Sequence, residues 1–291
     1  MEVMGPGAKF ITMLRDPVDV FESAYIYYRM FFKYNLTLGR LCVGWHKHRR
    51  WDVKSSNPGK FFKFLFLEEF AHKTDRDKPE NRILGIGKNQ MLFDLGLEEK
   101  YLDNEEEVVM KIKQIDKHFD LVMIAEFFSE SMVLLKHKLC WTTTDVKSFH
   151  LNGRMENGKS KLDTETKQLL AKYLRSDYML YNHFRKKFIE KMYSFGFEKI
   201  EKEVEELNKH NKYLADICSL RAAPNALLRG DQRWYGPSFL IGYQVNKTTE
   251  NADCALMTMS GLKYIERIRE KQRQEAEKLL RQTKRDNPRS L

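Results

Sequence analysis

The sequence predicts an α/β fold in which a parallel sheet is flanked by helices, because short apolar segments alternate with longer amphipathic ones. Residues 9–14 and 120–125 are the clearest strand candidates, and a helical pattern follows each of them. The 291 residues can bury one sizeable core, and no linker rich in Pro, Gly or Ser divides the chain. Hydrophobic residues make up 42% and charged residues 32%, which is typical of a folded globular domain.

The remaining helices are predicted from apolar residues that recur every three or four positions. They span residues 17–33, 58–71, 104–117, a segment from 129 onward, 163–175, 177–193, 197–212 and 260–284. Residues 89–96 predict an ordered loop or short helix. Pro and Gly interrupt residues 216–258, so that segment is predicted to be mixed.

The stretch KFITMLRDPVDVFESAYIYY, residues 9–28, predicts a buried strand, a tight turn and a helix. Asp16 is expected to cap this helix and Pro17 to occupy its first position, where a missing N–H costs nothing. Ligands bind at the carboxyl edge of parallel sheets, so Arg15 and the helix N-terminus together predict a site for phosphate or sulfate. The competing interpretation is a well-capped helix start with a surface arginine.

Ser23 supports the anion site over that alternative. It lies six residues after Pro17, about 9 Å up the helix axis, so a phosphate beside the first two turns could contact both Arg15 and the Ser23 hydroxyl. With Tyr25, which we assign to packing, Ser23 completes the spacing RDP-x5-S-x-Y. This spacing resembles the 3′-phosphate-binding motif of sulfotransferases that use PAPS, 3′-phosphoadenosine 5′-phosphosulfate.

Three further stretches narrow the resemblance to the Golgi galactose-3-O-sulfotransferases, the family of galactosylceramide sulfotransferase. They are NQMLFDLG (89–96), FDLVMIAEFFSESMVLLKHKLCW (119–141) and SDYMLYNHFRKKF (176–188). The resemblance implies transfer of sulfate from PAPS to the 3-hydroxyl of a terminal β-galactose on a glycolipid or glycoprotein. It also implies a P-loop-like sulfotransferase fold, no metal, and a location at the lumenal face of the Golgi membrane.

The resemblance further implies a strand–loop–helix for the 5′-phosphosulfate, which precedes the RDP strand and carries a lysine and the candidate catalytic histidine. Only eight residues precede Lys9, and they show no signal-anchor pattern. We therefore expect a fold truncated at its N-terminus, with the catalytic residues upstream of Met1 and membrane attachment only through an anchor outside this chain. The alternative is a truncated, non-catalytic relative that keeps part of the nucleotide site.

Arg15 and Ser23 are thus the predicted ligands of the PAPS 3′-phosphate. Asn89, Gln90 and Asp94 are candidates for binding the galactose acceptor, because amides and carboxylates suit paired sugar hydroxyls. The alternative is that these three residues pin a loop onto the sheet.

Four other polar residues also have predicted roles. His118 and His183 are expected to be structural rather than to act as a general base. Arg229 and Arg233, in RGDQRWYG, are candidates to close over the cofactor phosphate, on charge and glycine spacing alone.

The four cysteines show no zinc-site spacing, and their even number permits two disulfides in any of three pairings. Cys218 and Cys254 flank a loop-rich segment of the kind that a disulfide holds in the secretory pathway. Cys140 follows an apolar helix and is expected to be a buried thiol. Sequons at Asn35 and Asn246 are compatible with lumenal glycosylation.

The formal charge of +10 does not require a nucleic-acid partner. Residues 260–291 carry ten Lys/Arg and five Asp/Glu, so half of the excess lies in the tail. The basic stretch WHKHRRW (45–51) lacks an accompanying nucleic-acid-binding signature, and its histidines lack a Cys or Glu at metal-ligand spacing. We predict a sulfotransferase domain over residues 1–258. Residues 259–291 predict a basic helix and tail that is solvated or contacts anionic lipid or a partner.

Overall fold

The computed structural model describes residues 7–27, 87–154, 162–234, 240–245 and 252–286. The chain forms two compact units, one of residues 1–147 with 157–210 and the other of residues 148–156 with 211–291. The predicted helix 58–71, the basic stretch 45–51 and the sequons at Asn35 and Asn246 lie outside the described residues. The domain boundary after residue 258 stays a prediction.

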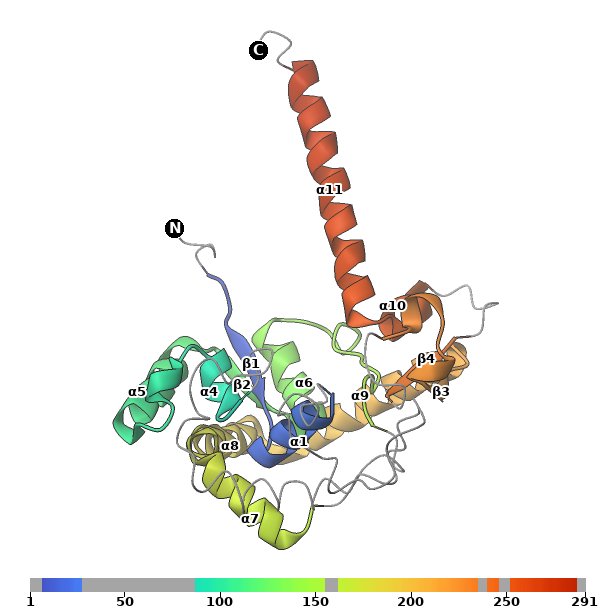
Figure 1. The fold of residues 1–291 in the computed structure, drawn as a ribbon. Coiled ribbons are helices and arrows are strands. Elements are labelled where there is room, and N and C mark those ends of the chain that lie inside the picture. Colours follow the sequence, from blue (N-terminus) through green and yellow to red (C-terminus); the bar gives the residue numbers. More distant parts are fainter. Residues whose placement is uncertain (1–6, 28–86, 155–161, 235–239, 246–251, 287–291) are drawn as a thin grey trace, which may run out of the picture. The chain divides into compact units, whose positions relative to one another are not determined.

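The first unit contains a small parallel sheet of two strands, β1 (Ile11–Leu14) and β2 (Leu121–Ile124) (Figure 1). The register pairs Ile11 with Leu121 and Leu14 with Ile124, so the two strands end at the same level. The α/β class is thereby confirmed, although helices predominate in the described residues.

Strand β1 is less buried than its sequence predicts. Leu14 is 2% exposed, as expected, but Ile11 and Met13 are 38% and 36% exposed. Within the described residues β1 pairs with β2 alone, and a strand at the edge of a sheet presents more of its side chains to solvent.

Helices of the first unit surround this sheet. Those described are α1 (Pro17–Tyr27), α4 (Gln90–Asp94), α5 (Glu105–His118), α6 (Phe128–Lys138), α7 (Thr164–Tyr173) and α8 (Arg175–Phe195), with 3₁₀ turns at Glu99–Tyr101 and Ala125–Phe127. Helices α6 and α8 pack against β2, α4 and α5 pack against α8, and α1 packs against α7 and α8 (Figure 1). The bounds of α5, α7 and α8 agree with their predicted positions to within two residues.

The core of the first unit follows the helical periodicity of the sequence. Helix α8 contributes Leu180, Phe184 and Phe188, which recur every four residues and lie on one side of the helix. Helix α5 buries Val108 and Ile112 in the same way. These side chains pack with the buried ends of β1 and β2 into one apolar cluster.

The first turn of α8 holds α4 through the carboxylate of Asp177. The backbone N–H groups of Met91 and Leu92 donate to Asp177 at 3.0 and 2.9 Å, and the Asp177 N–H donates to Asn89 Oδ1 at 3.2 Å. The Asn89 amide also donates to the Leu102 carbonyl at 3.4 Å. Asn89 and Asp177 are only 1% and 2% exposed. Hydrogen bonds between buried polar groups therefore join the stretch 89–96 to the stretch 176–188.

Replacement of Asp177 by asparagine should lower the free energy of unfolding by about 1–3 kcal/mol, because an NH₂ group replaces one acceptor and leaves a buried N–H without a partner. Urea unfolding monitored by circular dichroism measures the change. Asp103→Asn is the matched control. Its carboxylate pairs with Lys88 at 2.8 Å but is 64% exposed, so its loss should cost under about 0.5 kcal/mol. Equal effects of the two variants would contradict the anchoring role of Asp177.

Helix α9 (Phe197–Ile217) contributes residues to both units. The second unit also contains the antiparallel strands β3 (Arg221–Pro224) and β4 (Ile241–Gln244), helices α10 (Ala252–Thr258) and α11 (Gly261–Asp286), and 3₁₀ turns at Asn225–Leu227 and Gly230–Gln232. None of the helices in the described ranges is long and apolar enough to cross a membrane.

A disulfide between Cys218 and Cys254 joins the end of α9 to α10, across a sequence separation of 36 residues. This is the pair that flanks the loop-rich segment, and both cysteines are buried together with Leu214. The covalent link restrains this unit by closing the segment between the two cysteines into a loop.

The expectation that Cys140 is a buried thiol is wrong. Cys140 is free and exposed. It follows the end of α6 with a φ of 55°, a left-handed conformation that commonly ends helices. The chain turns there, so the apolar side of α6 does not continue to Cys140.

A Cys218→Ser variant should destabilise the second unit by about 2–4 kcal/mol, because the unfolded chain regains the freedom of a closed loop. Trypsin digestion followed by mass spectrometry should show faster cleavage within residues 211–286. Cys140→Ser is the control and should leave the digestion rate unchanged, since that thiol is exposed and unbonded. Unchanged protection in Cys218→Ser would show that the disulfide is dispensable.

Candidate functional site

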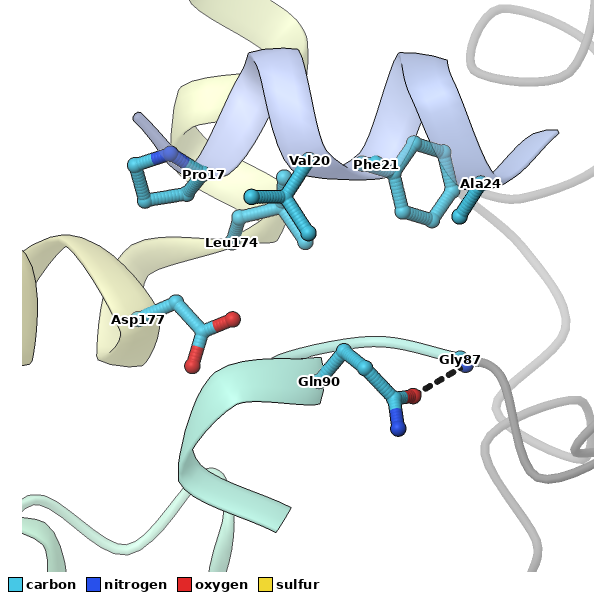
Figure 2. Close-up of a pocket in the computed structure, with 8 residues that line it drawn as sticks. All are labelled: Pro17, Val20, Phe21, Ala24, Gly87, Gln90, Leu174 and Asp177. Atoms are coloured by element: carbon cyan, nitrogen blue, oxygen red, sulfur yellow. Dashed lines mark hydrogen bonds between the residues drawn. The ribbon is translucent and has the colours of Figure 1, made fainter. Parts of the chain in front are cut away.

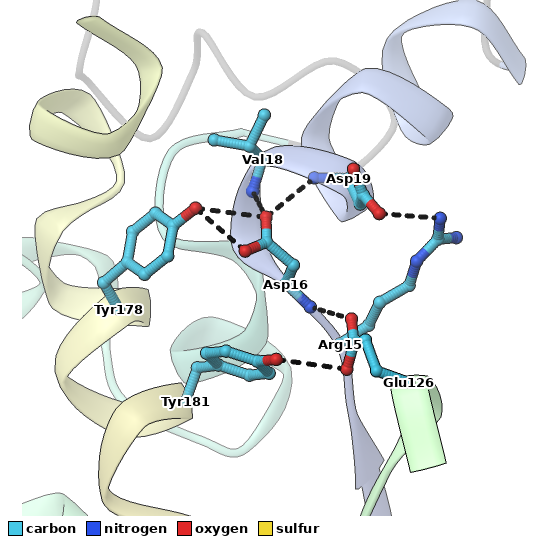
Figure 3. Close-up of polar contacts among 7 residues, drawn as sticks. All are labelled: Arg15, Asp16, Val18, Asp19, Glu126, Tyr178 and Tyr181. Carbon is cyan, nitrogen blue, oxygen red and sulfur yellow. Dashed lines mark hydrogen bonds and ion pairs between the residues drawn. The ribbon is translucent and has the colours of Figure 1, made fainter. Parts of the chain in front are cut away.

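The carboxyl ends of β1 and β2 meet at one edge, where Glu126 connects three elements (Figure 3). The Asp16 N–H, just past β1, donates to Glu126 Oε1 at 2.8 Å. The hydroxyl of Tyr181 on α8 donates to Glu126 Oε2 at 3.2 Å. One carboxylate just after β2 therefore fixes the direction in which the chain leaves β1.

Asp16 caps α1, as the sequence predicts. Its Oδ1 accepts from the N–H groups of Val18 and Asp19 at 3.0 and 3.3 Å. The Tyr178 hydroxyl donates to both carboxylate oxygens, at 3.0 and 3.1 Å (Figure 3). Because Asp16 already satisfies these two N–H groups, an anion bound here would depend on side chains rather than on the open helix N-terminus expected from the sequence.

The two tyrosines are hydrogen-bond donors at any physiological pH. Burial, reinforced by the Asp16 carboxylate, raises the pKa of Tyr178 well above its ordinary value of 10.0. Burial and the charge of Glu126 raise the pKa of Tyr181 to about 12. Each hydroxyl therefore keeps its proton and bonds an acidic oxygen.

Arg15 precedes α1 and Ser23 lies within it, and Asp19 is four residues from each of them along the chain. Arg15 Nη2 lies 3.2 Å from Asp19 Oδ2, and these side chains are 44% and 49% exposed. Asp19 and Ser23 are four residues apart and so lie on the same side of α1. The Ser23 hydroxyl is half-buried and has no hydrogen-bond partner among the described residues.

A small pocket touches α1, as Figure 2 shows. It is lined by Pro17, Val20, Phe21, Ala24, Gly87, Gln90, Leu174 and Asp177. Its volume of about 10 Å³ leaves room for roughly one water molecule. This pocket is too small to hold a sugar or a nucleotide.

The three residues predicted to bind the acceptor lie in and beside α4, but they differ in exposure. Asn89 is buried and bonded to α8 and to the Leu102 carbonyl, which favours the loop-pinning alternative for this residue. Gln90 accepts from the Gly87 N–H at 2.8 Å and donates to Asp94 Oδ1 at 2.8 Å. Asp94 is exposed, so acceptor binding stays a prediction for Gln90 and Asp94.

Neither His118 nor His183 has a hydrogen bond or ion pair with Glu126 among the described residues; each lies beside other groups. His118 ends α5, ahead of β2, and its Nδ1 lies 2.6 Å from the Gln114 carbonyl oxygen. His183 Nε2 lies 3.6 Å from Asp116. Both contacts suit structural roles. Among the described residues, no group of three or more His, Cys, Asp or Glu could hold a metal ion.

The arginines of RGDQRWYG belong to the second unit. Arg229 donates to the carbonyls of Ala226 and Leu228 at 3.1 and 3.0 Å, and so stabilises its own turn. A role for Arg229 and Arg233 in closing over a phosphate stays a prediction.

Glu126 directly follows the predicted strand 120–125, but the sequence pattern predicts neither its contact with Asp16 nor the roles of Tyr178 and Tyr181. The available clue is that residues following two adjacent parallel strands meet at one edge of the sheet. A second clue is that these tyrosines are three residues apart, so they lie on the same side of α8.

Comparisons with known proteins place the sequence in a family. A family model described as galactose-3-O-sulfotransferase matches residues 65–272, more than half of the chain. The chain belongs to the galactose-3-O-sulfotransferase family. Asn89, Glu126 and Asp177 lie inside the matched region, whereas Arg15 and Ser23 precede it.

Individual members of the galactose-3-O-sulfotransferase family align over much of the chain. Galactosylceramide sulfotransferase of Mus musculus is 31% identical over 214 residues, covering 73% of this chain and 45% of the relative. The Bos taurus protein of that name is 29% identical over 253 residues, covering 84% and 54%. Galactose-3-O-sulfotransferase 2 of Mus musculus is 26% identical over 273 residues, covering 91% and 63%. The chain spans about half the length of the curated relatives it matches. No solved structure matches it.

Glu126→Gln should lower the free energy of unfolding by about 1–2 kcal/mol. The glutamine oxygen can accept one of the two hydrogen bonds, but the NH₂ group that replaces the other oxygen is a donor and faces the second donor. Tyr181→Phe removes one of the same bonds. The double variant should therefore be destabilised by less than the sum of the single variants, as measured by urea unfolding of all four proteins. Strict additivity would show that the two groups are not coupled.

Proposed function

We propose that this chain is part of a carbohydrate sulfotransferase that moves sulfate from PAPS to the 3-hydroxyl of a terminal β-galactose. The acceptor is galactosylceramide or a related glycolipid or glycoprotein glycan. Membership of the galactose-3-O-sulfotransferase family carries this proposal, and the relatives' names specify galactose and galactosylceramide. We place the protein at the lumenal face of the Golgi membrane, a setting in which the Cys218–Cys254 disulfide would persist.

The donor side of the proposed site is the strand–turn–helix of residues 11–27. We assign the sheet to a P-loop-like sulfotransferase fold, with the Arg15 guanidinium and the Ser23 hydroxyl binding the 3′-phosphate. Arg15 is exposed at the carboxyl edge of the strands, and Asp16 and Glu126 hold the turn that carries it. PAPS would supply the activated sulfuryl group. These residues would bind and orient the nucleotide that carries it.

A phosphate that binds Arg15 must replace the ion pair between Arg15 and Asp19. The Arg15–Asp19 pair is solvent-exposed, so its contribution is below about 1 kcal/mol. A phosphate accepts two parallel hydrogen bonds from a guanidinium and carries more charge than a carboxylate. The phosphate would therefore displace Asp19 from Arg15. The Asp19 carboxylate would remain nearby and weaken binding by repulsion.

Arg15→Ala should weaken binding of adenosine 3′,5′-bisphosphate by about tenfold or more, and Arg15→Lys by less, since lysine keeps the charge without the paired donors. Asp19→Asn should tighten binding severalfold. Isothermal titration calorimetry measures the affinities. The ligand control is adenosine 5′-monophosphate, whose affinity should not change, since it lacks the 3′-phosphate. The protein control is Arg175→Ala on α8, an exposed arginine that pairs with Glu105. An unchanged affinity of Arg15→Ala for the bisphosphate would refute the assignment.

Sulfate transfer itself is tested with the protein expressed from its complete natural reading frame. We expect labelled sulfate to pass from PAPS to galactosylceramide or lactose, and Arg15→Ala to reduce the transfer. Binding of the bisphosphate without any transfer would instead support the alternative of a non-catalytic relative. Sequencing the transcript upstream of Met1 establishes which reading frame to express.

A further inference from the structure

Helix α11, of 26 residues, carries exposed large apolar side chains in its first two turns and again at residues 279–280. Its large apolar residues are spaced so that they lie on one side, and all are exposed. They are Leu262, Tyr264, Ile265, Ile268, Leu279 and Leu280. Leu279 and Leu280 are 64% and 62% exposed, far more than side chains that pack against a neighbour. A helix with such an uncovered side gains stability when an apolar phase covers it.

The charges of α11 are distributed unevenly. Residues 261–282 contain seven Lys/Arg and four Glu, a net charge of +3. Every glutamate is paired with a basic residue of the same helix, in the pairs Lys263–Glu266, Arg273–Glu270 and Arg273–Glu277 at 2.7 Å and Lys271–Glu275 at 3.9 Å. Arg267, Arg269 and Lys278 have no acidic partner among the described residues. The excess positive charge is therefore not neutralised within the helix.

The three unpaired cations border the apolar side. Arg267 lies three residues from Tyr264, beside one border, and Lys278 follows the same border. Arg269 lies seven residues from Leu262 and so stands at the opposite border. Long basic side chains at such borders can reach charged groups at the edge of an apolar surface while the helix side between them is buried.

A second copy of this helix fits the pattern poorly. In a coiled coil, apolar residues recur at the first and fourth positions of each heptad. Starting from Leu262 and Ile265, the next two such positions are Arg269 and Gln272. The seam is polar in its middle, so a continuous packed interface does not form. A lipid surface tolerates the interruption, because it does not require matching side chains.

We propose that α11 lies flat on a membrane surface that carries anionic lipid headgroups, with Leu279, Leu280, Ile265 and Ile268 inserted among the acyl chains and the unpaired cations facing the headgroups. This arrangement is that of an interfacial amphipathic helix. The anion is a lipid phosphate or a lipid sulfate, which present the same charge to arginine. The inference rests on α11 alone and does not depend on the proposed sulfotransferase activity.

Flotation of the full chain with lipid vesicles tests the proposal, without PAPS or acceptor present. We expect recovery with vesicles of phosphatidylcholine plus phosphatidylserine, or of phosphatidylcholine plus sulfated galactosylceramide, and little recovery with phosphatidylcholine alone. The ratio of the two anionic samples identifies the preferred headgroup. Binding should fall as salt is added, because the charge contribution is screened.

Matched substitutions separate the two sides of the helix. Leu279→Glu should reduce vesicle binding about tenfold or more, whereas Gln274→Glu, which adds the same charge on the polar side, should reduce it much less. Replacing both Arg267 and Lys278 by glutamine should reduce binding about thirtyfold, since each basic residue near an anionic surface contributes about 1 kcal/mol. Circular dichroism should show unchanged helix content in every variant, because these side chains are exposed.

Two results would overturn the proposal. One is equal recovery of the wild-type chain with neutral and anionic vesicles. The other is a dimer in light scattering that Leu279→Glu converts to a monomer, in the absence of vesicle binding. The second result would assign the apolar side to a second copy of the chain.

Discussion

The Glu126 carboxylate accepts two hydrogen bonds, and the geometry of the strand edge depends on both of them. Its Oε1 holds the backbone that leaves β1, and its Oε2 holds a tyrosine of α8. This arrangement is available only because the parallel register ends β1 and β2 at the same level. A shift of one residue in that register would move Asp16 away from Glu126 and would reverse which side chains of β1 face the core. The direction of α1, and with it the position of Arg15, follows from this pairing.

Much of the local structure could be predicted from the sequence, because the interactions that determine it are close together in the chain. Asp16 caps α1 by bonding N–H groups two and three residues away, and Pro17 begins that helix. The periodicity of α8 likewise locates its buried side without reference to other elements. The pairing of β1 with β2 follows from their apolar character and the helical patterns after each.

The arrangement of the site depends on contacts that no local pattern contains. The amide side chain of Asn89 predicts a sugar ligand, because amides suit paired sugar hydroxyls. The structure buries Asn89 against α8, some 90 residues later in the sequence. A cysteine that follows an apolar helix predicts burial, but Cys140 is exposed because the left-handed end of α6 redirects the chain. In both cases the surroundings, rather than residue type, decide the role. The pairing of Asp19 with Arg15 differs in kind, because the two residues are only four positions apart and their opposite charges at that spacing predict it.

Helix α8 brings together three side chains within little more than one turn. Asp177 bonds the start of α4, Tyr178 bonds Asp16, and Tyr181 bonds Glu126. Each added or deleted residue rotates everything beyond it by about 100° around a helix axis. An insertion or deletion between Asp177 and Tyr181 would therefore detach one segment while leaving another attached. Evolution can change these residues by substitution, but it cannot change the length of this stretch without separating α4 from the strand edge.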